Sequence, residues 1–584
     1  MKNNWILKEK AIKEDIKRLV EELNIPEVIA CLLIKRGITT YEEARSFFRP
    51  HLEQLHNPFL MKDMQKSVER IERAITKKER ILIFGDYDVD GTSAVALMYS
   101  FLKQFDVYLE YYIPDRYIEG YGISSKSVEY AKEHTFSLII SLDCGIKCHS
   151  QIDLANQYGI DVVVCDHHLP DSTLPKAYSI LNPKRTDCSY PYKELSGCGV
   201  GFKLIQAIAL YRNIPFNELI QYLDLVVISI ASDIVSITGE NRILAYYGLK
   251  LINSNPRQGI EFILSFSNIF RRDYKIHPPT RSIFNKEITI NDLVFLVGPR
   301  INAAGRMNTG RNSVHLLICN KEKKVSELGE LIDNHNSERR ELDSKTTIQA
   351  IEQIKNNTNF EHSRSLVVYN PDWSKGVIGI VASRLVEQFY KPTVVLTLFD
   401  GIITGSARSV KGFDLYHALS QCSHLLEHFG GHTFAAGLSL KPEKLHAFIE
   451  TFENIVSSSI LQESINPVID IDEEIDLKDI NENFYAILKQ FAPFGPGNMM
   501  PVFMTKNVLD SGKARIVGQK HLKLSVFQSE KRSFPMDAIA FGFGDYYNKI
   551  IQRNPFHICY HVELNAWQGR KILQLCIKDI KFDD

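Results

Sequence analysis

The chain has 584 residues, of which 44% are hydrophobic and 24% are charged, as in ordinary globular proteins. This length exceeds what a single hydrophobic core supports, so about three or four domains are expected. The formal net charge of −1 excludes a global electrostatic attraction to nucleic acid or to membranes, and any polyanion site must therefore be a local basic patch.

The cysteine pattern and the apolar runs indicate a cytoplasmic protein. The ten cysteines are scattered, contain no C-x-x-C pair and lie mostly inside apolar segments, as reduced thiols do. The first residues lack the apolar core of a signal peptide, and no apolar run reaches the length of a bilayer crossing. We therefore expect no membrane association.

The first part of the chain is predicted to be helical, and the next part to alternate between strands and helices. Residues 1–75 keep the apolar spacing of helices. From Arg80 onward, a βαβ series predicts a parallel, doubly wound sheet with helices on both faces. The expected strands are 81–84, 107–113, 137–142 and 161–165, and the expected helices between them are 91–105, 124–133 and 147–158.

Three carboxylates follow the first predicted strand of this sheet. Asp86, Asp88 and Asp90 stand at every second position, so an extended chain would point all three side chains the same way. Clustered carboxylates repel one another unless a cation compensates them, and Mg²⁺ or Mn²⁺ prefer such oxygen ligands. An acidic turn that caps a helix is the alternative. A calcium loop is excluded, because a strand precedes the motif and Leu97 stands at the twelfth position.

Acidic and imidazole side chains recur after other apolar runs. Asp143 follows 138–142, Asp166-His167-His168 follows 162–165, and Asp233 follows the apolar stretch 225–231. Ligands of parallel sheets bind beyond the carboxyl ends of the strands, so these groups are expected at one edge. Together they predict a metal site. A zinc site made by Cys144, Cys148, Cys165 and His167 matches no zinc spacing.

A long helix and two further domains are expected after this sheet. Residues 321–356 contain one glycine and no proline and keep helical apolar spacing, which favours a rigid spacer over a coiled-coil arm. Residues 364–458 again alternate between strands and helices. Residues 467–584 contain several β-like runs separated by glycine and asparagine, which suggests a small closed barrel.

One strand of the second alternating region carries groups suited to phosphate. Ser406 and Arg408 are two positions apart on the predicted strand 402–407 and its end, so they share a face. A hydroxyl and a guanidinium fork suit phosphate, and the alternative is a surface salt bridge. Arg116, Arg300 and Arg306, in other glycine-rich stretches, favour a distributed phosphate-binding surface.

These motifs together resemble the DHH phosphoesterase superfamily, and within it the family of RecJ single-strand-specific exonucleases. The resemblance rests on Asp86-Tyr-Asp-Val-Asp-Gly, Asp143-Cys-Gly, Asp166-His-His and Ser232-Asp233, on the stretches 113–122 and 298–306, and on 405–409 and 428–437. It implies an α/β protein: a doubly wound parallel-sheet DHH domain, a long helix, a second α/β domain and a C-terminal OB-like β-barrel. The implied boundaries are 1–75 for an N-terminal helical segment, 76–320 for the DHH domain, 321–356 for the connector helix, 357–460 for the DHH-associated domain and 461–584 for the OB-like domain.

The resemblance also implies roles for residues. Two Mn²⁺ or Mg²⁺ ions would be bound, with Asp143 as the bridging ligand, and two neutral imidazoles among the carboxylates would favour Mn²⁺ over an all-oxygen Mg²⁺ site. The implied metal ligands are Asp86, Asp88, Asp90, Asp143, His167 and Asp233. The implied catalytic set is Asp143, Asp166, His167 and His168. The implied nucleic-acid and phosphate contacts are Arg116, Arg300, Asn302, Arg306, Ser406, Arg408 and His432.

The function implied is a single-stranded-DNA-specific 5′→3′ exonuclease of recombination and repair, which hydrolyses phosphodiesters and releases nucleotides. A monomer is expected, with single-stranded DNA, a single-strand-binding protein and a helicase as partners. Two alternatives are a DHH nanoRNase or phosphatase on short oligonucleotides and a non-catalytic strand-binding replication factor. The barrel opposes the first and the intact Asp/His set opposes the second.

Overall fold

The computed structural model describes residues 3–272, 282–307, 309–356, 360, 362–531, 533–567 and 570–583. By its internal contacts the chain divides into two compact units. One comprises residues 55–467, and the other combines the two chain ends, 1–54 and 468–584. Among the described residues, no helix combines the length and apolar character that a bilayer crossing requires.

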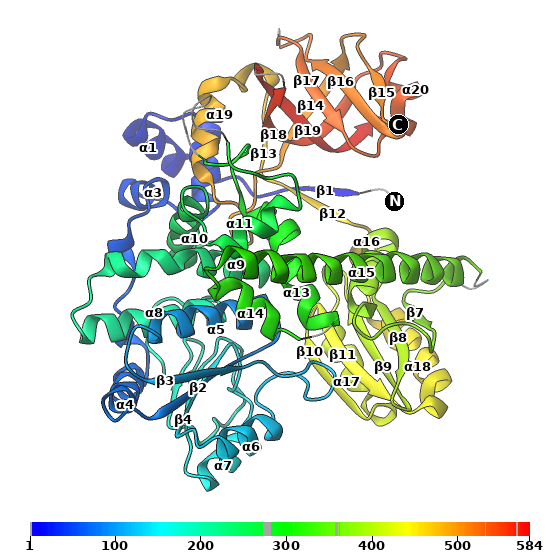
Figure 1. Cartoon of the computed structure of the whole chain (residues 1–584). Helices are drawn as coiled ribbons and strands as arrows, with labels where there is room; N and C mark the ends of the chain where they lie inside the picture. The colour runs from blue at the N-terminus through cyan, green and yellow to red at the C-terminus, as the bar shows by residue number, and fades with distance from the viewer. Residues whose placement is uncertain are drawn as a thin grey trace. The chain divides into compact units, whose positions relative to one another are not determined.

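The larger unit contains the expected parallel sheet (Figure 1). Five parallel strands lie in the order β3-β2-β4-β5-β6, so the prediction of a doubly wound α/β domain is confirmed. The central strands are buried because both faces are covered, which explains their continuous apolar runs. The strands are β2 (Arg80–Gly85), β3 (Tyr108–Tyr112), β4 (Leu138–Leu142), β5 (Asp161–Cys165) and β6 (Ser179–Leu181).

Helices cover both faces of this sheet. Leu82 and Ile139 pack with Val128 and Ile152 of α6 and α7 on one face. The alternate residues of β2 point to the opposite face, where α5 and α8 lie against the strands. The helices of this region are α4 (Met64–Thr76), α5 (Val89–Leu102), α6 (Ser125–Glu133), α7 (His149–Gln157), α8 (Gly197–Tyr211), α9 (Leu223–Ser232), α10 (Gly239–Ile252), α11 (Gln258–Ser265), α12 (Ile290–Asp292), α13 (Gly298–Met307) and α14 (Arg311–Ile318).

The expected long helix is α15 (Glu322–Lys355), 34 residues in one piece. At a rise of 1.5 Å per residue it spans about 51 Å. Its first half packs against α11, α13 and α14, while Ala350 and Ile354 pack into the core of the second sheet. Figure 1 shows α15 running from the helices of the first sheet to the strands of the second. The buried apolar positions of α15 therefore pack within this unit, whereas Leu331 and Ile348 are exposed.

The second sheet of the larger unit has the order β10-β11-β9-β8-β7. Only the pair β7–β8 is parallel. Helices α16 and α18 supply buried residues to the two cores of this domain. The elements are β7 (Leu366–Tyr369), α16 (Ile378–Phe389), β8 (Thr393–Phe399), β9 (Ile402–Arg408), α17 (Leu415–Gln421), β10 (His428–His432), β11 (Ala435–Leu440) and α18 (Leu445–Ser459).

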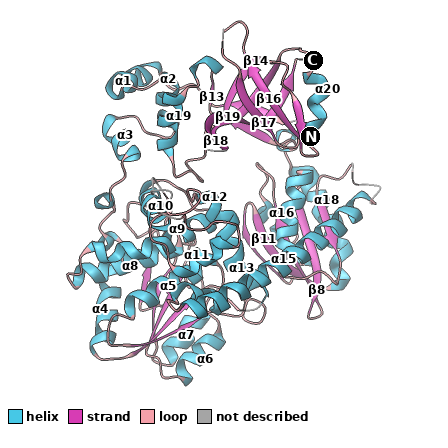
Figure 2. Ribbon diagram, turned by 45° about the horizontal axis from the view of Figure 1, so that its top comes forward, coloured by secondary structure: helices cyan, strands magenta, loops and turns pink. Residues whose placement is uncertain are grey.

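The smaller unit contains the barrel (Figure 2). Its sheet runs β13-β14-β18-β19-β17-β16-β15, and an additional pairing of β14 with β16 closes five of these strands into a barrel. The elements are β12 (Val468–Ile471), β13 (Glu473–Glu474), α19 (Glu482–Leu488), β14 (Phe503–Asp510), β15 (Arg515–Val517), β16 (His521–Phe527), β17 (Met536–Ala540), α20 (Tyr547–Ile550), β18 (Phe556–Trp567) and β19 (Arg570–Phe582).

The N-terminal residues fold onto this barrel and divide the expected 1–75 segment between the two units. Strand β1 (Asn4–Leu7) pairs in parallel with β12. Buried residues of α1 (Lys13–Leu23), α2 (Glu27–Ile34) and α3 (Tyr41–Phe48) share one apolar core with α19 and the barrel. The barrel therefore needs residues from both ends of the chain to bury its apolar surface.

Leu32→Ala is expected to destabilise the barrel although it lies more than 400 residues before it. Leu32 is fully buried in the shared core, so the cavity should cost about 3 kcal/mol. Hydrogen exchange measured by mass spectrometry should accelerate in residues 503–580. The control is Ile12→Ala, because Ile12 is 64% exposed. Unchanged exchange in 503–580 would contradict the shared core.

Candidate metal centre

The carboxyl ends of neighbouring strands bring the predicted acidic groups together. Asp86 follows β2, Asp143 follows β4, and Asp166 and His167 follow β5, and all four residues are buried. Because β2, β4 and β5 are adjacent and parallel, these side chains emerge at one edge of the sheet. These side chains therefore lie at the carboxyl edge of the sheet, where the sequence analysis expects them.

The first motif differs from the expected extended chain. Asp88 is the N-cap of α5, and its carboxylate accepts a hydrogen bond of 3.0 Å from the Gly91 amide. Asp90 therefore lies inside the first helical turn, and the prediction that three extended residues alternate onto one face is wrong for it. Its carboxylate accepts hydrogen bonds from the Gly197 and Cys198 amides and the Ser229 hydroxyl, each 2.7 Å long. Asp90 thus fixes the start of α8.

Asp233 reaches the site from a helix. The apolar stretch 225–231 lies within α9, and Asp233 is the C-cap of this helix. Its Oδ2 lies 3.5 Å from Nε2 of His167. A sheet strand is therefore not required to deliver this carboxylate.

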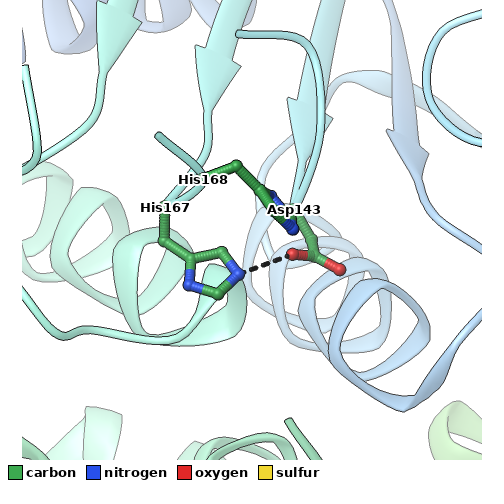
Figure 3. Close-up of side chains that lie close together, drawn as sticks. All are labelled: Asp143, His167 and His168. Carbon is green, nitrogen blue, oxygen red and sulfur yellow. Dashed lines mark ion pairs between the residues drawn. The ribbon is translucent and has the colours of Figure 1, made fainter. Parts of the chain in front are cut away.

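His167 lies close to carboxylates from three different elements, and Figure 3 shows its ring directed at Asp143. Its Nε2 lies 3.2 Å from Oδ1 of Asp143 and 3.8 Å from Oδ2 of Asp90. Ligand atoms of Asp143, His167 and His168 lie within 4.8 Å of one another, and so do those of Asp90, His167 and Asp233. The two sets share His167 and together bring five potential metal ligands into one small volume.

Four buried polar atoms of this cluster lack hydrogen-bond partners within the described part of the chain. Oδ1 of Asp86, Oδ1 of Asp143 and both ring nitrogens of His167 are buried and make no hydrogen bond there. An unsatisfied buried polar group costs about 1–3 kcal/mol, and charged groups cost more. A pair of divalent cations would satisfy these atoms, so the residues present fit the metals that the sequence predicts.

The pKa shifts of these side chains also favour a metal site. Burial raises the pKa of the Asp86, Asp143 and Asp233 carboxyls well above the usual range, and neighbouring carboxylates raise it further. Burial and Asp90 also raise the pKa of Asp88. Burial lowers the pKa of His167, which favours the neutral imidazole that ligates metals.

Asp166 and His168 are held differently. Burial opposes the Asp166 charge, but hydrogen bonds from the His168 ring and from backbone amides outweigh it and lower the pKa of Asp166 to about 2. Its Oδ2 accepts from the Ile146 amide at 2.9 Å, and its Oδ1 lies 2.8 Å from Nδ1 of His168. The pairing with Asp166 raises the pKa of His168 despite its burial. Asp166 therefore orients the loop that carries both histidines.

Residues that the sequence analysis did not single out complete the site. Gly197 passes so close to Asp143 that an added Cβ would lie 2.6 Å from Cβ and Oδ1 of Asp143. The Ser196 side chain caps α8, and the Tyr121 hydroxyl donates to the Asp143 carbonyl at 2.8 Å. The sequence signal was Ser196-Gly-Cys-Gly before an apolar run, which is a helix start rich in glycine.

The predicted phosphate contacts gather around β9 and the start of α16. Ser406 and Arg408 share a face of β9, and Nη1 of Arg408 donates to Oγ of Ser406 at 3.0 Å. An added Cβ on Gly379 of α16 would lie 3.0 Å from that Oγ. Arg116 lies over the Tyr87 ring, and Nη1 of Arg306 donates to the Gly376 carbonyl at 3.0 Å.

The other three predicted phosphate contacts, Arg300, Asn302 and His432, lie on α13 and β10. Arg300 is 7% exposed, and its Nε donates to Asp333 of α15 at 2.8 Å, so its guanidinium joins α13 to α15. Asn302 is half-buried on α13, and His432 is exposed on β10. Burial and the cationic neighbours His168, Lys147 and Lys184 lower the pKa of His432.

Comparisons with known proteins match these parts. Residues 80–230 match the DHH family N-terminal domain, 363–458 the DHHA1 domain and 471–579 the RecJ OB domain. The chain is 35% identical to the single-stranded-DNA-specific exonuclease RecJ of Bacillus subtilis, covering 97% of this chain and 69% of that protein. It is 30% identical to the RecJ of Escherichia coli K12, covering 95% and 96%.

Solved structures show the same fold. The fold is similar to RecJ of Thermus thermophilus in complex with Mn²⁺, with a TM-score of 0.83 at 22% identity over 100% of this chain and 80% of that one. A structure of exonuclease RecJ bound to manganese gives 0.57 at 25% identity, over 71% and 98%. By this likeness over nearly its whole length, the chain belongs to the family of RecJ single-stranded-DNA-specific exonucleases.

Proposed function

We propose that this protein degrades single-stranded DNA from its 5′ end, hydrolysing phosphodiesters with two Mn²⁺ or Mg²⁺ ions. The observation that carries this proposal is the buried cluster of Asp86, Asp143 and His167, in which one oxygen of each carboxylate and both ring nitrogens make no hydrogen bond to the described residues. Such a cluster is destabilising without cations, which favours metal-dependent chemistry.

The named activities of the relatives support this substrate. The proteins of Bacillus subtilis and Escherichia coli are single-stranded-DNA-specific exonucleases, and one solved relative is bound to manganese. Residues 471–579 match the RecJ OB domain, and barrels of this kind bind single strands by stacking and basic side chains. Both features favour a polynucleotide substrate over a short one, against the nanoRNase or phosphatase alternative.

The metal ligands we propose are Asp86, Asp88, Asp90, Asp143, His167 and Asp233. Two bound cations would activate a water molecule and stabilise the attacking and leaving oxygens of an in-line displacement. The protein positions these ligands through the strand ends and through α5 and α9. Asp166 holds His167 and His168 by backbone and side-chain hydrogen bonds, and Tyr121 holds the Asp143 carbonyl. Asp90 and Ser196 fix the start of α8 next to Asp143.

We infer that the 5′ end is held by Arg116, Ser406 and Arg408, with Arg306 beside them. A guanidinium and a hydroxyl on one strand face provide the directed donors that a terminal phosphate requires. Asn302 and His432 remain proposed contacts of the same strand. Arg300 is the least favourable of this set, because Asp333 already accepts from its guanidinium. We further infer a cytoplasmic monomer that acts with a single-strand-binding protein and a helicase in recombination and repair.

One assay tests polarity and substrate together. With Mn²⁺, a single strand labelled at its 5′ end should release labelled mononucleotide at once, whereas a 3′-labelled strand should release label only after progressive shortening. A blunt duplex should resist, and chelation with EDTA should stop hydrolysis until Mn²⁺ is restored. Early release of the 3′ label would reverse the proposed polarity, and EDTA-resistant hydrolysis would remove the metal centre from the mechanism.

A further inference from the structure

The connector helix carries an arginine whose contacts with its neighbours are incomplete. Arg339 of α15 donates through Nη2 to Oδ1 of Asn336 at 2.8 Å. Its Nε is buried and makes no hydrogen bond to any described residue. Since a buried, unpaired donor costs about 1–3 kcal/mol, the fold alone does not explain this geometry.

The carboxylate next to Arg339 is already engaged. The Asp343 side chain, one turn further along α15, is fully buried and accepts a hydrogen bond of 2.7 Å from Nη2 of Arg384 on α16. The Thr347 hydroxyl lies 3.5 Å from its other oxygen. Asp343 therefore pairs with Arg384 and joins α15 to α16, so its negative charge is shared between Arg384 and Arg339.

Other cations approach the same place from different elements. Burial and the neighbouring charges of Arg116, Arg339 and Arg408 lower the pKa of Arg306 to about 10. The side chain of Arg306 donates to the neutral Gly376 carbonyl, and that of Arg408 donates to Ser406 and a backbone carbonyl. Arg306 thus lies among three other arginines. The Asp343 carboxylate, which acts on both Arg306 and Arg339, is paired with a fifth arginine, Arg384, and Asp86 acts on Arg116. Such a group of positive charges favours the binding of an anion.

We propose that Arg339 is a further phosphate contact, which binds the terminal 5′-phosphate of the strand together with Arg116, Arg306 and Arg408. The inference rests on the proposed function and extends it to the connector helix. A terminal phosphate is a dianion with several acceptor oxygens, and it would accept the free Nε–H of Arg339 as well as the other guanidinium donors. The ion pair between Asp343 and Arg384 joins α15 to α16 one turn from Arg339.

The test compares two neighbouring arginines of one helix. Arg339→Gln removes the charge and the fork, and the matched control Arg340→Gln removes an exposed charge one position away. Binding is measured by fluorescence anisotropy with full-length protein in Ca²⁺, using one oligodeoxynucleotide that carries either a 5′-phosphate or a 5′-hydroxyl. A lost charge-assisted contact should raise Kd for the 5′-phosphorylated strand about tenfold. Arg339→Gln should leave the Kd for the 5′-hydroxyl strand nearly unchanged. Arg340→Gln should change the Kd for neither strand.

Further measurements separate the possible failures. Arg339→Lys keeps the charge but not the fork and should give an intermediate Kd, which a folding defect would not produce. The control Arg340→Gln should cleave bis(p-nitrophenyl) phosphate with Mn²⁺ at the wild-type rate, and neither Arg339 variant should lower the Tm, because removing a buried unpaired donor does not destabilise the fold. Equal rises in Kd for both strands would overturn the terminal-phosphate assignment, and an unchanged Kd for both would remove the contact. Failure of the wild-type protein to degrade DNA would instead refute the proposed function. The binding comparison would still test whether Arg339 contacts the 5′-phosphate.

Discussion

Asp143→Asn is expected to reduce DNA hydrolysis by roughly 10³-fold, a loss of about 4 kcal/mol of transition-state stabilisation. Asp143 is 2% exposed, lies 3.2 Å from His167 and faces several other carboxylates. Its neutral amide would remove one charge from the set that attracts the cations. The backbone should tolerate the change, because φ of Asp143 is 61° and asparagine adopts this left-handed conformation readily.

The stability of this variant distinguishes a metal ligand from a structural residue. In metal-free protein the buried carboxylates repel one another, so Asp143→Asn should unfold at the same or a higher temperature. Wild-type protein should gain thermal stability when Mn²⁺ is added, and the variant should gain much less. Differential scanning calorimetry with and without Mn²⁺ measures both effects. A large drop in the metal-free Tm would show that Asp143 serves the fold.

Gly197→Ala is expected to reduce hydrolysis by roughly 100-fold without unfolding the protein. Its Cβ would lie 2.6 Å from two side-chain atoms of Asp143 and 2.8 Å from its Cα, so the carboxylate has to move. A displacement near 1 Å at a reacting centre costs about this factor. The measurement is kcat on single-stranded DNA, with the Tm recorded in parallel.

The control for this variant lies two residues further along the same helix. An added Cβ on Gly199 meets its nearest atom, the Oγ of Ser196, at 3.2 Å and does not approach Asp143. Gly199→Ala should keep most of the activity and, since alanine favours helices over glycine by about 1 kcal/mol, should not lower the Tm. If both variants lose activity equally, the close approach to Asp143 is not the cause.

The parallel sheet and most of the metal cluster could be predicted from sequence, because local signals specify them. Buried parallel strands are short continuous apolar runs, and an aspartate directly after such a run is placed at the carboxyl edge by topology alone. Asp86, Asp143 and Asp166 follow β2, β4 and β5 directly, and His167 comes next after Asp166. For these residues, the position directly after a strand was enough to place the side chain at the carboxyl edge of the sheet.

The parts that could not be predicted depend on contacts between distant residues. Asp90 is fixed by the backbone amides of Gly197 and Cys198, which lie more than 100 positions later in the chain. No local sequence pattern predicts such a contact. The stretch 225–231 is short and uniformly apolar, so its periodicity cannot separate the helix observed from a buried strand. The pairing of β1 with β12 joins residues more than 460 positions apart.

The union of the two chain ends sets an order of events during synthesis. Residues 1–54 leave the ribosome well before the barrel residues that cover their apolar faces, 468–584. At about 5–20 residues per second, translation of the intervening residues 55–467 takes roughly 20–80 s, and the N-terminal helices lack their barrel partner for that time. The intervening unit can fold within that interval, whereas the helices stay exposed to aggregation and to chaperones. Slowed elongation or early termination should therefore harm these terminal segments before it harms the metal-binding fold.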